Sequence, residues 1–370
     1  MNISLRTSAV WVTAALLGFT AMASASELHG PDGSQPAHRG GRTFVIERPQ
    51  QVFVIGHQWP GTYFEGHFSG PAVTAKLEDT VNRFALYVDG KIVATQRDSA
   101  TGSLTASGFS ADEHSVRLEQ LSENQGPATT FVGFFAAQPD HKTGHWPKRT
   151  RTIEFIGDSY TVGYGNTSPK RQCTQAEIHD TTDTSQAFGP IVAKHYDADY
   201  QINAISGHGI VRNYGGAPGD PVPVAYPYDT FDHAHVHSDQ FWQPQIIVIG
   251  LGTNDFSTPL NAGEKWKTRD DLHADYEATY VKFVKNLRTQ NPNAQFVLMA
   301  TDQVEGEIQA EVKKVITRLN ADGESRIVFL PMNGLEMTGC DWHPSTADDR
   351  KVSGILMAYI DAHPELWQGK

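Results

Sequence analysis

The chain has 370 residues, of which 39% are hydrophobic and 19% charged, and its formal net charge is −12. This composition is typical of a folded globular protein and excludes a disordered one, while the length favours two domains over one. The acidic balance, without any basic stripe, excludes a nucleic-acid partner because nothing in the chain would neutralise phosphates.

The first 25 residues have the pattern of a secretory signal peptide. Arg6 precedes an apolar run over residues 9–21, and Ala23, Ser24 and Ala25 follow as a cleavage site. The apolar run is shorter than the roughly 20 residues that a membrane-spanning helix needs, and no later segment is apolar for that length. We therefore expect residues 1–25 to be a leader, the protein to be exported to the periplasm or the medium, and no membrane anchor.

Residues 26–140 predict a β-sandwich, because short β-type runs are separated by turns and show no helical period. Asp89 and Gly90 stand between two of these runs and form a strong hairpin signal. The expected strands lie at 43–46, 51–55, 63–68, 84–88, 91–94 and 116–121.

A proline-containing connector at 140–149 separates this part from residues 150–370, where strands alternate with helices. Such alternation predicts an α/β domain, a parallel sheet covered by helices on both faces, with ligands at the carboxyl ends of the strands. The expected strands lie at 152–156, 200–205, 246–251, 295–300 and 326–330, and the expected helices at 184–196, 270–288, 306–319 and 347–360.

The first chemical motif follows the first of these strands. Gly157, Asp158 and Ser159 would turn the chain from a strand into a helix, which places the serine hydroxyl at the sheet edge beside free N–H groups. Taken alone the motif is weak, because Asp158 and Ser159 are also ordinary helix-capping residues.

Two further motifs end later strands. Gly207 could turn its backbone N–H towards the same site, which a larger side chain would obstruct. Asn254 offers a side-chain N–H that can donate to an oxyanion without titrating. The alternatives are a flexible turn at Gly207 and an Asx-turn at Asn254.

The fourth motif stands just before the last expected helix. His343 can accept the proton of the serine, provided that a carboxylate or carbonyl fixes its tautomer. Asp341, two residues earlier, could supply that carboxylate.

The four motifs follow one another along the chain in the order serine, glycine, asparagine, histidine. This order resembles that of the four conserved blocks of the SGNH (GDSL-type) hydrolase superfamily. More closely, the motifs look like those of carbohydrate esterase family 2, whose members join an N-terminal jelly roll to an SGNH domain and deacetylate plant polysaccharides such as xylan and glucomannan. The matching segments are 157–166, 206–214, 252–256 and 339–345.

The resemblance implies a role for each matched residue. Ser159 would be the nucleophile, Gly207 and Asn254 would complete the oxyanion hole, and His343 would be the acid and base. Many SGNH enzymes place the aspartate three residues before the histidine, whereas Asp341 stands two before it, and some members of the family use a backbone carbonyl instead. Asp341 and a backbone carbonyl are therefore both open as the orienting group.

The chain has only two cysteines, Cys173 and Cys340. Export would permit a disulfide, which would tie the loop of His343 to the loop after the nucleophile, although two buried free thiols are the alternative. Two cysteines without paired ligands are a poor zinc signal, and we expect no metal and no cofactor. The alternating histidines at 233, 235 and 237 favour a surface loop over a metal site.

Three aromatic residues beside the motifs, Tyr214, Phe256 and Trp342, could form a platform for sugar rings, and ordinary packing is the alternative. The sequence thus predicts an exported serine esterase that acts on an acetylated polysaccharide. The competing functions are another SGNH activity (lipase, thioesterase or peptidoglycan O-acetylesterase) and a non-catalytic carbohydrate-binding protein. The sequence specifies neither the oligomeric state nor whether the jelly roll binds sugar or only braces the fold.

Overall fold

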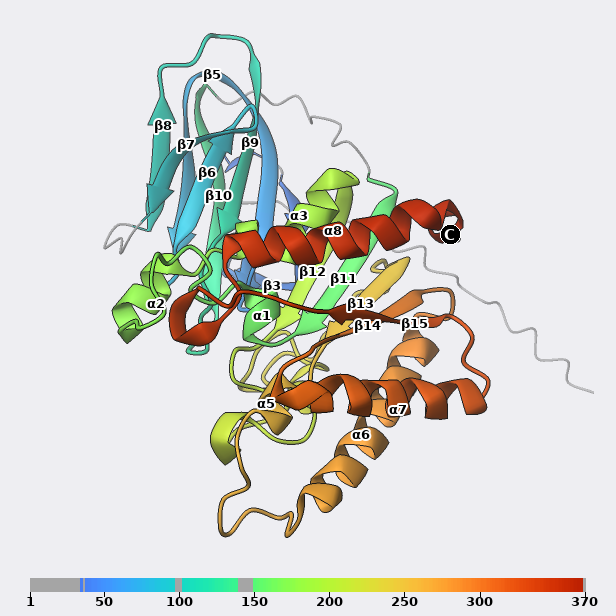
Figure 1. The fold of residues 1–370 in the computed structure, drawn as a ribbon. Coiled ribbons are helices and arrows are strands. Elements are labelled where there is room, and N and C mark those ends of the chain that lie inside the picture. Colours follow the sequence, from blue (N-terminus) through green and yellow to red (C-terminus); the bar gives the residue numbers. More distant parts are fainter. Residues whose placement is uncertain (1–33, 36, 97–101, 139–148, 369–370) are drawn as a thin grey trace, which may run out of the picture.

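The computed structural model describes residues 34–35, 37–96, 102–138 and 149–368. The predicted leader and most of the predicted connector lie outside these residues, so both the leader and the domain boundary stay predictions. Within the described residues the strands form two sheets, one antiparallel and one parallel (Figure 1). We call the described part of 34–138 the antiparallel region and 149–368 the parallel region.

The antiparallel region is built around one long strand, β5 (Tyr63–Glu78). Its first half pairs with β9 and β2, and its second half pairs with β10 and β8. The sheet is therefore continuous through β5, although its two halves form facing layers. The other strands are β1 (Ser34–Gln35), β2 (His38–Gly40), β3 (Thr43–Arg48), β4 (Val52–His57), β6 (Phe84–Val88), β7 (Lys91–Gln96), β8 (Ser103–Ser107), β9 (Glu113–Gln120) and β10 (Thr129–Gln138).

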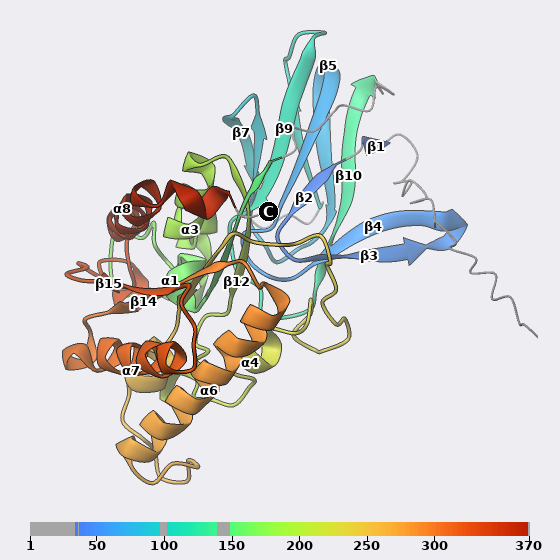
Figure 2. The same cartoon turned by 90° about the vertical axis from the view of Figure 1, so that its right-hand side faces the viewer.

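Alternating apolar side chains from both layers form the core of this region, as the period of two along each strand predicts. Phe64 of β5 stacks on Phe131 of β10 with ring centroids 4.0 Å apart, which shows that the layers face each other. The Asp89-Gly90 hairpin is confirmed, because both residues adopt the positive φ that such a tight turn requires. Figure 2 shows β3 and β4 as a hairpin that extends to one side.

The parallel region contains the predicted five-stranded sheet, with strand order β12-β11-β13-β14-β15. The apolar runs read from the sequence are its strands, of which the first four along the chain are mostly buried and β15, at the edge of the sheet, is partly buried. They are β11 (Arg151–Gly157), β12 (Ala198–Ala204), β13 (Ile246–Gly250), β14 (Gln295–Thr301) and β15 (Ile327–Met332).

Helices cover both faces of this sheet, which confirms the predicted α/β class (Figure 1). α3 (Phe188–His195) and α8 (Thr346–Ala362) pack on one face, and α6 (Arg269–Gln290) and α7 (Glu307–Ala321) pack on the other. None of the helices in the described ranges has both the length and the apolarity needed to cross a bilayer. Shorter elements are α1 (Ser159–Val162), α2 (Gln175–Thr181), α4 (Val222–Ala225), α5 (Thr253–Phe256) and the 3-10 turns η2 (Thr184–Gln186), η3 (Tyr214–Gly216) and η5 (Cys340–Trp342).

The helix expected from residue 184 begins only at Phe188. Asp183 accepts the N–H of Ser185 and closes the separate turn η2, after which Ala187 is extended. The long segment 211–243 contains η3, α4 and one isolated bridge. Two of its histidines contact other side chains of the protein: His235 stacks on Phe44, and Nδ1 of His237 contacts the carboxylate of Asp229.

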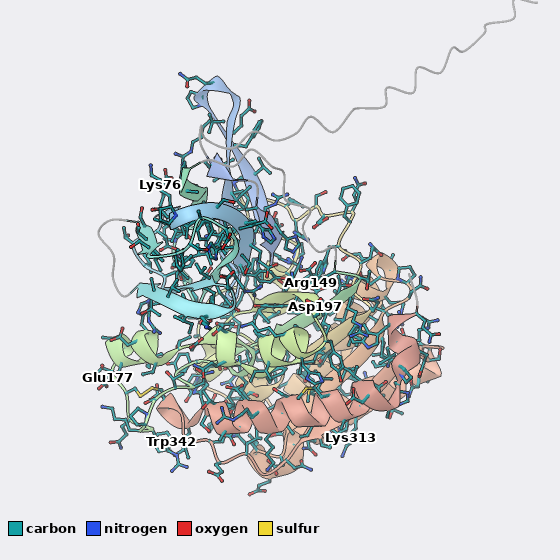
Figure 3. All side chains as sticks on the ribbon, turned by 90° about the horizontal axis from the view of Figure 1, so that it is seen from above. Lys76, Arg149, Glu177, Asp197, Lys313 and Trp342 are labelled. Atoms are coloured by element: carbon teal, nitrogen blue, oxygen red, sulfur yellow. A yellow bond between two sulfur atoms is a disulfide. The ribbon has the colours of Figure 1, made fainter. Side chains whose placement is uncertain are left out.

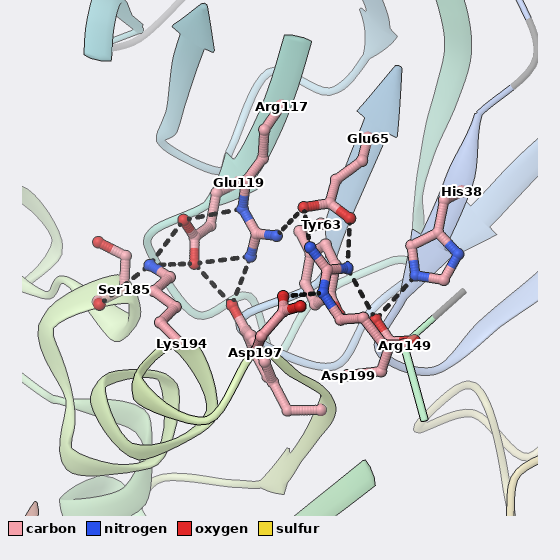
Figure 4. Close-up of polar contacts among 11 residues, drawn as sticks. His38, Tyr63, Glu65, Arg117, Glu119, Arg149, Ser185, Lys194, Asp197 and Asp199 are labelled. Carbon is pink, nitrogen blue, oxygen red and sulfur yellow. Dashed lines mark hydrogen bonds and ion pairs between the residues drawn. The ribbon is translucent and has the colours of Figure 1, made fainter. Parts of the chain in front are cut away.

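A charged network joins the two regions (Figure 4). Glu119 of β9 is fully buried and accepts hydrogen bonds from Lys194 at 3.0 Å and Tyr200 at 2.6 Å, both from the parallel region. Burial alone would raise the pKa of Glu119, but Arg117 and Lys194 outweigh it and lower the pKa to about 2. Arg149 lies at the start of the parallel region and contacts Glu65 of β5 at 2.9 Å.

Candidate active site

Ser159 is held at the carboxyl edge of the parallel sheet, where β11 turns directly into α1. Asp158 caps this short helix by accepting the N–H of Tyr160 at 3.1 Å. Glycine is required at 157, because a Cβ there would lie 2.0 Å from Oγ1 of Thr161. The tight turn leaves the Ser159 side chain facing the cleft described below.

The structure brings His343 to Ser159, with Nε2 of the histidine 2.9 Å from Oγ of the serine. The other ring nitrogen, Nδ1, lies 2.9 Å from the carbonyl oxygen of Cys340. This carbonyl accepts the Nδ1 proton and leaves Nε2 free to accept the proton of the serine hydroxyl. Burial lowers the pKa of His343, while the nearby carbonyls and the charge of Asp341 act in the opposite direction.

The carboxylate of Asp341 does not make the predicted contact with the histidine. Asp341 has a φ of +50° within η5, and this turn directs its side chain to the hydroxyl of Tyr164, 3.4 Å away. Its backbone carbonyl, rather than its carboxylate, lies 3.2 Å from Nδ1 of His343. Of the two alternatives read from the sequence, the geometry favours the backbone carbonyl.

Cys173 and Cys340 are joined by a disulfide, with their Cα atoms 5.5 Å apart. In Figure 3 this bond lies between the labelled residues Glu177 and Trp342. The turn η5, which supplies the carbonyl for His343, is therefore covalently tied to the segment before α2.

Gly207 and Asn254 lie on the same cleft as Ser159. Gly207 has a φ of +83°, a conformation that favours glycine, although a Cβ there would meet no atom within 4 Å. Within the described ranges, the backbone N–H groups of Ser159 and Gly207 donate to no protein acceptor. They are consequently free to bind a ligand oxygen.

The side-chain amide of Asn254 is already engaged. Its Nδ2 donates to the carbonyl of His208 at 2.9 Å and to Oδ2 of Asp158 at 3.2 Å. An amide nitrogen carries two hydrogens, so donation to a ligand oxygen requires exchange of the longer contact. Burial raises the pKa of Asp158 to about 7, which makes its carboxyl the weaker of the two acceptors as the pH falls.

The cleft has a volume of about 890 Å³ and is lined by residues of both regions. Tyr214 and Trp342 line it with 57% and 56% of their surfaces exposed, so both rings are available to a ligand. Phe256 is different, because it is only 1% exposed and packs edge-on against Tyr276. The prediction that Phe256 stacks on sugar is therefore wrong.

A second buried carboxylate, Asp255, shapes the loop that carries Gly207. It accepts the N–H groups of Ile210, Val211 and Arg212 at distances of 2.9–3.0 Å. Burial raises the pKa of Asp255 to about 6, although the three N–H groups oppose this shift. Arg212 pairs with Glu264 at 2.6 Å and braces the same loop.

Several residues that line the cleft were not identified from the sequence, and three of them contact His343 or the loop of Gly207. Tyr164 packs its ring 4.3 Å from the ring of His343. Glu123 and Gln125 come from the loop between β9 and β10 and contact Ser206, more than 80 residues away in the chain. The polar turn around Gly126 and Pro127 predicts a loop, but no local pattern places that loop at the site.

One group of potential metal ligands occurs among the described residues: His38, Glu65 and Asp199. The guanidinium of Arg149 already contacts both carboxylates, at 2.9 Å from Glu65 and 3.0 Å from Asp199 (Figure 4). An arginine therefore supplies the positive charge in this cluster, which forms part of the network between the regions.

A serine paired with a histidine at the edge of a parallel sheet, beside free N–H donors, has the arrangement of a serine hydrolase site. Family models agree: residues 153–353 match the GDSL-like lipase/acylhydrolase model and residues 47–147 match the carbohydrate esterase 2 N-terminal model.

Curated relatives identify the family. An acetylxylan esterase / glucomannan deacetylase of Cellvibrio japonicus is 45% identical over 357 residues, which cover 95% of this chain and 99% of that protein. The cellulase/esterase CelE of Acetivibrio thermocellus is 29% identical over 82% of this chain and 37% of its own, longer chain.

Solved structures agree with these relatives. A carbohydrate esterase whose active site is described as having divergent catalytic and non-catalytic binding functions superposes with a TM-score of 0.85 at 45% identity, covering 90% of this chain and 99% of that chain. A family two carbohydrate esterase from Clostridium thermocellum in complex with cellohexaose gives 0.76 at 27% identity, covering 90% of this chain and 100% of that one. The chain belongs to carbohydrate esterase family 2, and it is an esterase.

Proposed function

We propose that this esterase is exported and removes O-acetyl groups from plant polysaccharides, acetylated xylan or acetylated glucomannan, through an acetyl-enzyme intermediate. The observation that carries the proposal is the 2.9 Å contact between Ser159 Oγ and His343 Nε2 within an open cleft. The names of the relatives support the substrate class.

In the first step, Ser159 Oγ attacks the acetyl carbonyl and Nε2 of His343 takes the hydroxyl proton. The imidazolium that forms keeps its Nδ1–H directed at the carbonyl of Cys340. Because this carbonyl is part of the main chain, it orients the ring without itself titrating.

The attack converts the carbonyl oxygen into an oxyanion. The N–H groups of Ser159 and Gly207 donate to it, and Asn254 joins them by releasing its longer contact with Asp158. Each such donor is worth about 3 kcal/mol of transition-state stabilisation.

The bond from the acetyl carbon to the sugar oxygen then breaks, and His343 gives its proton to that oxygen, which leaves as a sugar hydroxyl. Water enters, His343 takes one of its protons, and the resulting attack releases acetate from Ser159. The serine regains its proton from His343, so the enzyme is unchanged.

Tyr214 and Trp342 hold the sugar chain at the rim of the cleft by stacking on its apolar faces. A relative that holds cellohexaose supports a sugar-chain ligand. The lining of the cleft mixes polar side chains with exposed aromatic rings, which suits a sugar chain better than a long acyl group and disfavours a lipase.

The test is acetate release from acetylated xylan and from acetylated glucomannan by the purified protein and by Ser159→Ala. We expect release from at least one polymer and its loss in the variant. Cleavage of a small aryl acetate without release from either polymer would refute the substrate class, and equal activity of the variant would refute the role of Ser159.

A further inference from the structure

The peptide that joins Ser206 to Gly207 lines the same cleft as Ser159, and its N–H and C=O groups differ in their contacts. The N–H of Gly207 is free of protein acceptors, whereas the carbonyl of Ser206 is not. In a trans peptide these two groups point in opposite directions across one rigid plane. Whatever holds the carbonyl therefore also aims the N–H.

The group that holds this carbonyl comes from the antiparallel region. Nε2 of Gln125 donates to the carbonyl of Ser206 at 2.9 Å, and Oε1 of Glu123 accepts the N–H of Ser206 at 2.8 Å. Nε2 of Gln125 also donates to Oε1 of Glu123 at 3.2 Å. Both neighbours of this amide nitrogen are acceptors, so the orientation of the Gln125 amide is unambiguous.

The loop that carries Glu123 and Gln125 is itself braced. Asn124 is buried, donates to the carbonyl of Pro127 at 2.7 Å and accepts the N–H of Gly126 at 2.7 Å. Gln58 of the same region donates to the carbonyl of Gly126 at 2.5 Å. A braced loop can hold a distant peptide in one orientation, which is the condition for a preorganised donor.

We propose that Glu123 and Gln125 are positioning residues for the oxyanion hole: they clamp the backbone of Ser206 and thereby aim the N–H of Gly207 at the substrate oxygen. Donation to the Ser206 carbonyl also polarises that peptide, which strengthens its N–H as a donor. This inference rests on the proposed function, because it takes Gly207 as an oxyanion donor. It gives the antiparallel region a part in the chemistry, beyond bracing the fold or binding sugar.

The decisive variant is Gln125→Met, which keeps the length of the side chain and removes its donor. Gln125 is exposed, so the fold does not depend on its burial. We expect kcat on a small aryl acetate to fall about tenfold with KM within about twofold, because an oxyanion donor acts mainly in the transition state. The affinity for a boronic acid that forms a tetrahedral adduct with the serine should fall by a similar factor.

Two further variants separate positioning from general damage. Glu123→Gln keeps an acceptor oxygen for the N–H of Ser206 and should stay within about threefold of wild-type kcat. Lys194→Met removes a contact with Glu119 between the two regions. Neither residue lines the cleft, so this variant should lower the melting temperature at unchanged kcat.

The outcomes are distinguishable. Wild-type kcat in Gln125→Met, with Ser159→Ala inactive, would overturn the positioning role and leave the proposed function intact. An equal loss of kcat in Lys194→Met would also overturn the positioning role, because the loss would then come from a change in how the two regions are oriented relative to each other. An inactive wild-type protein on every ester would overturn the proposed function, and this inference would fall with it.

Discussion

The two sides of the cleft are held in different ways. The pair of Ser159 and His343 lies entirely within the parallel region, and a backbone carbonyl and a disulfide from the same region orient it. The peptide of Ser206 and Gly207 also belongs to the parallel region, but Glu123 and Gln125 of the antiparallel region hold it. In the proposed mechanism, proton transfer therefore depends on one region, whereas charge stabilisation depends on both.

Substitutions on the two sides of the cleft should therefore affect activity in different ways. Changes around His343 should alter how activity depends on pH, because they act on a titrating group. Changes around Gly207 should lower kcat at every pH, because a backbone N–H does not titrate.

The largest effect is expected from His343→Ala, which removes the proton acceptor. We expect kcat on an aryl acetate to fall on the order of 10⁴- to 10⁶-fold, as for other serine hydrolases that lose a core catalytic group. Asp341→Ala is the matched comparison and should lose less than about tenfold, because the carbonyl of Cys340 still orients the ring. A loss in Asp341→Ala comparable to that in His343→Ala would contradict the backbone assignment.

Asn254→Ala tests the other side of the cleft. Removing one oxyanion donor should lower kcat about 10²- to 10³-fold, with a small change in KM. Steady-state kinetics on the same aryl acetate measure both constants. A rise in KM at constant kcat would show that Asn254 binds the ground state instead.

The pH profile separates the two sides directly. His343 must be neutral to accept the proton, so kcat/KM should fall as the pH drops through its pKa, which burial holds below the ordinary value of 6.5. The charge of Asp341 raises this pKa, so Asp341→Asn should move the acidic limb to lower pH. Gln125→Met should lower kcat/KM without moving the limb.

Asp158, with its pKa raised to about 7, titrates close to Ser159 and can contribute to the absolute position of the limb. The informative quantity is therefore the shift between each variant and the wild type. An unmoved limb in Asp341→Asn would contradict the electrostatic contribution of Asp341.

The smallest effect on rate is expected from removing the disulfide in the double variant Cys173→Ser/Cys340→Ser. The bond joins residues 167 positions apart, and its loss should cost about 2–5 kcal/mol of folding stability. The melting temperature should fall, while kcat at 25 °C should change by less than about threefold because η5 keeps its backbone contacts. A reductant should lower the melting temperature of the wild type alone.

Much of the fold follows from local patterns. All five parallel strands begin and end within a few residues of the apolar runs that predict them, because a strand covered by helices on both faces of its sheet needs a continuous apolar segment. β10 was not predicted. Its bulge, marked by the φ of +150° at Gly133, interrupts the alternation on which strand prediction depends.

The site was also predictable only in part. Ser159, Gly207, Asn254 and His343 stand at strand ends or before the last helix, and parallel topology brings these positions to one edge. The residue type alone did not predict that Trp342 is exposed and Phe256 is buried, because exposure depends on what packs against each ring.

The sequence by itself determined the order of the motifs, the strands that carry them, and the two cysteines available to pair. Tertiary structure alone decided that the carbonyl of Cys340 faces His343, that Phe256 enters the core, and that Glu123 and Gln125 reach Ser206. The reason is physical: strand and turn preferences depend on near neighbours in the chain, whereas these contacts depend on how distant segments are packed together.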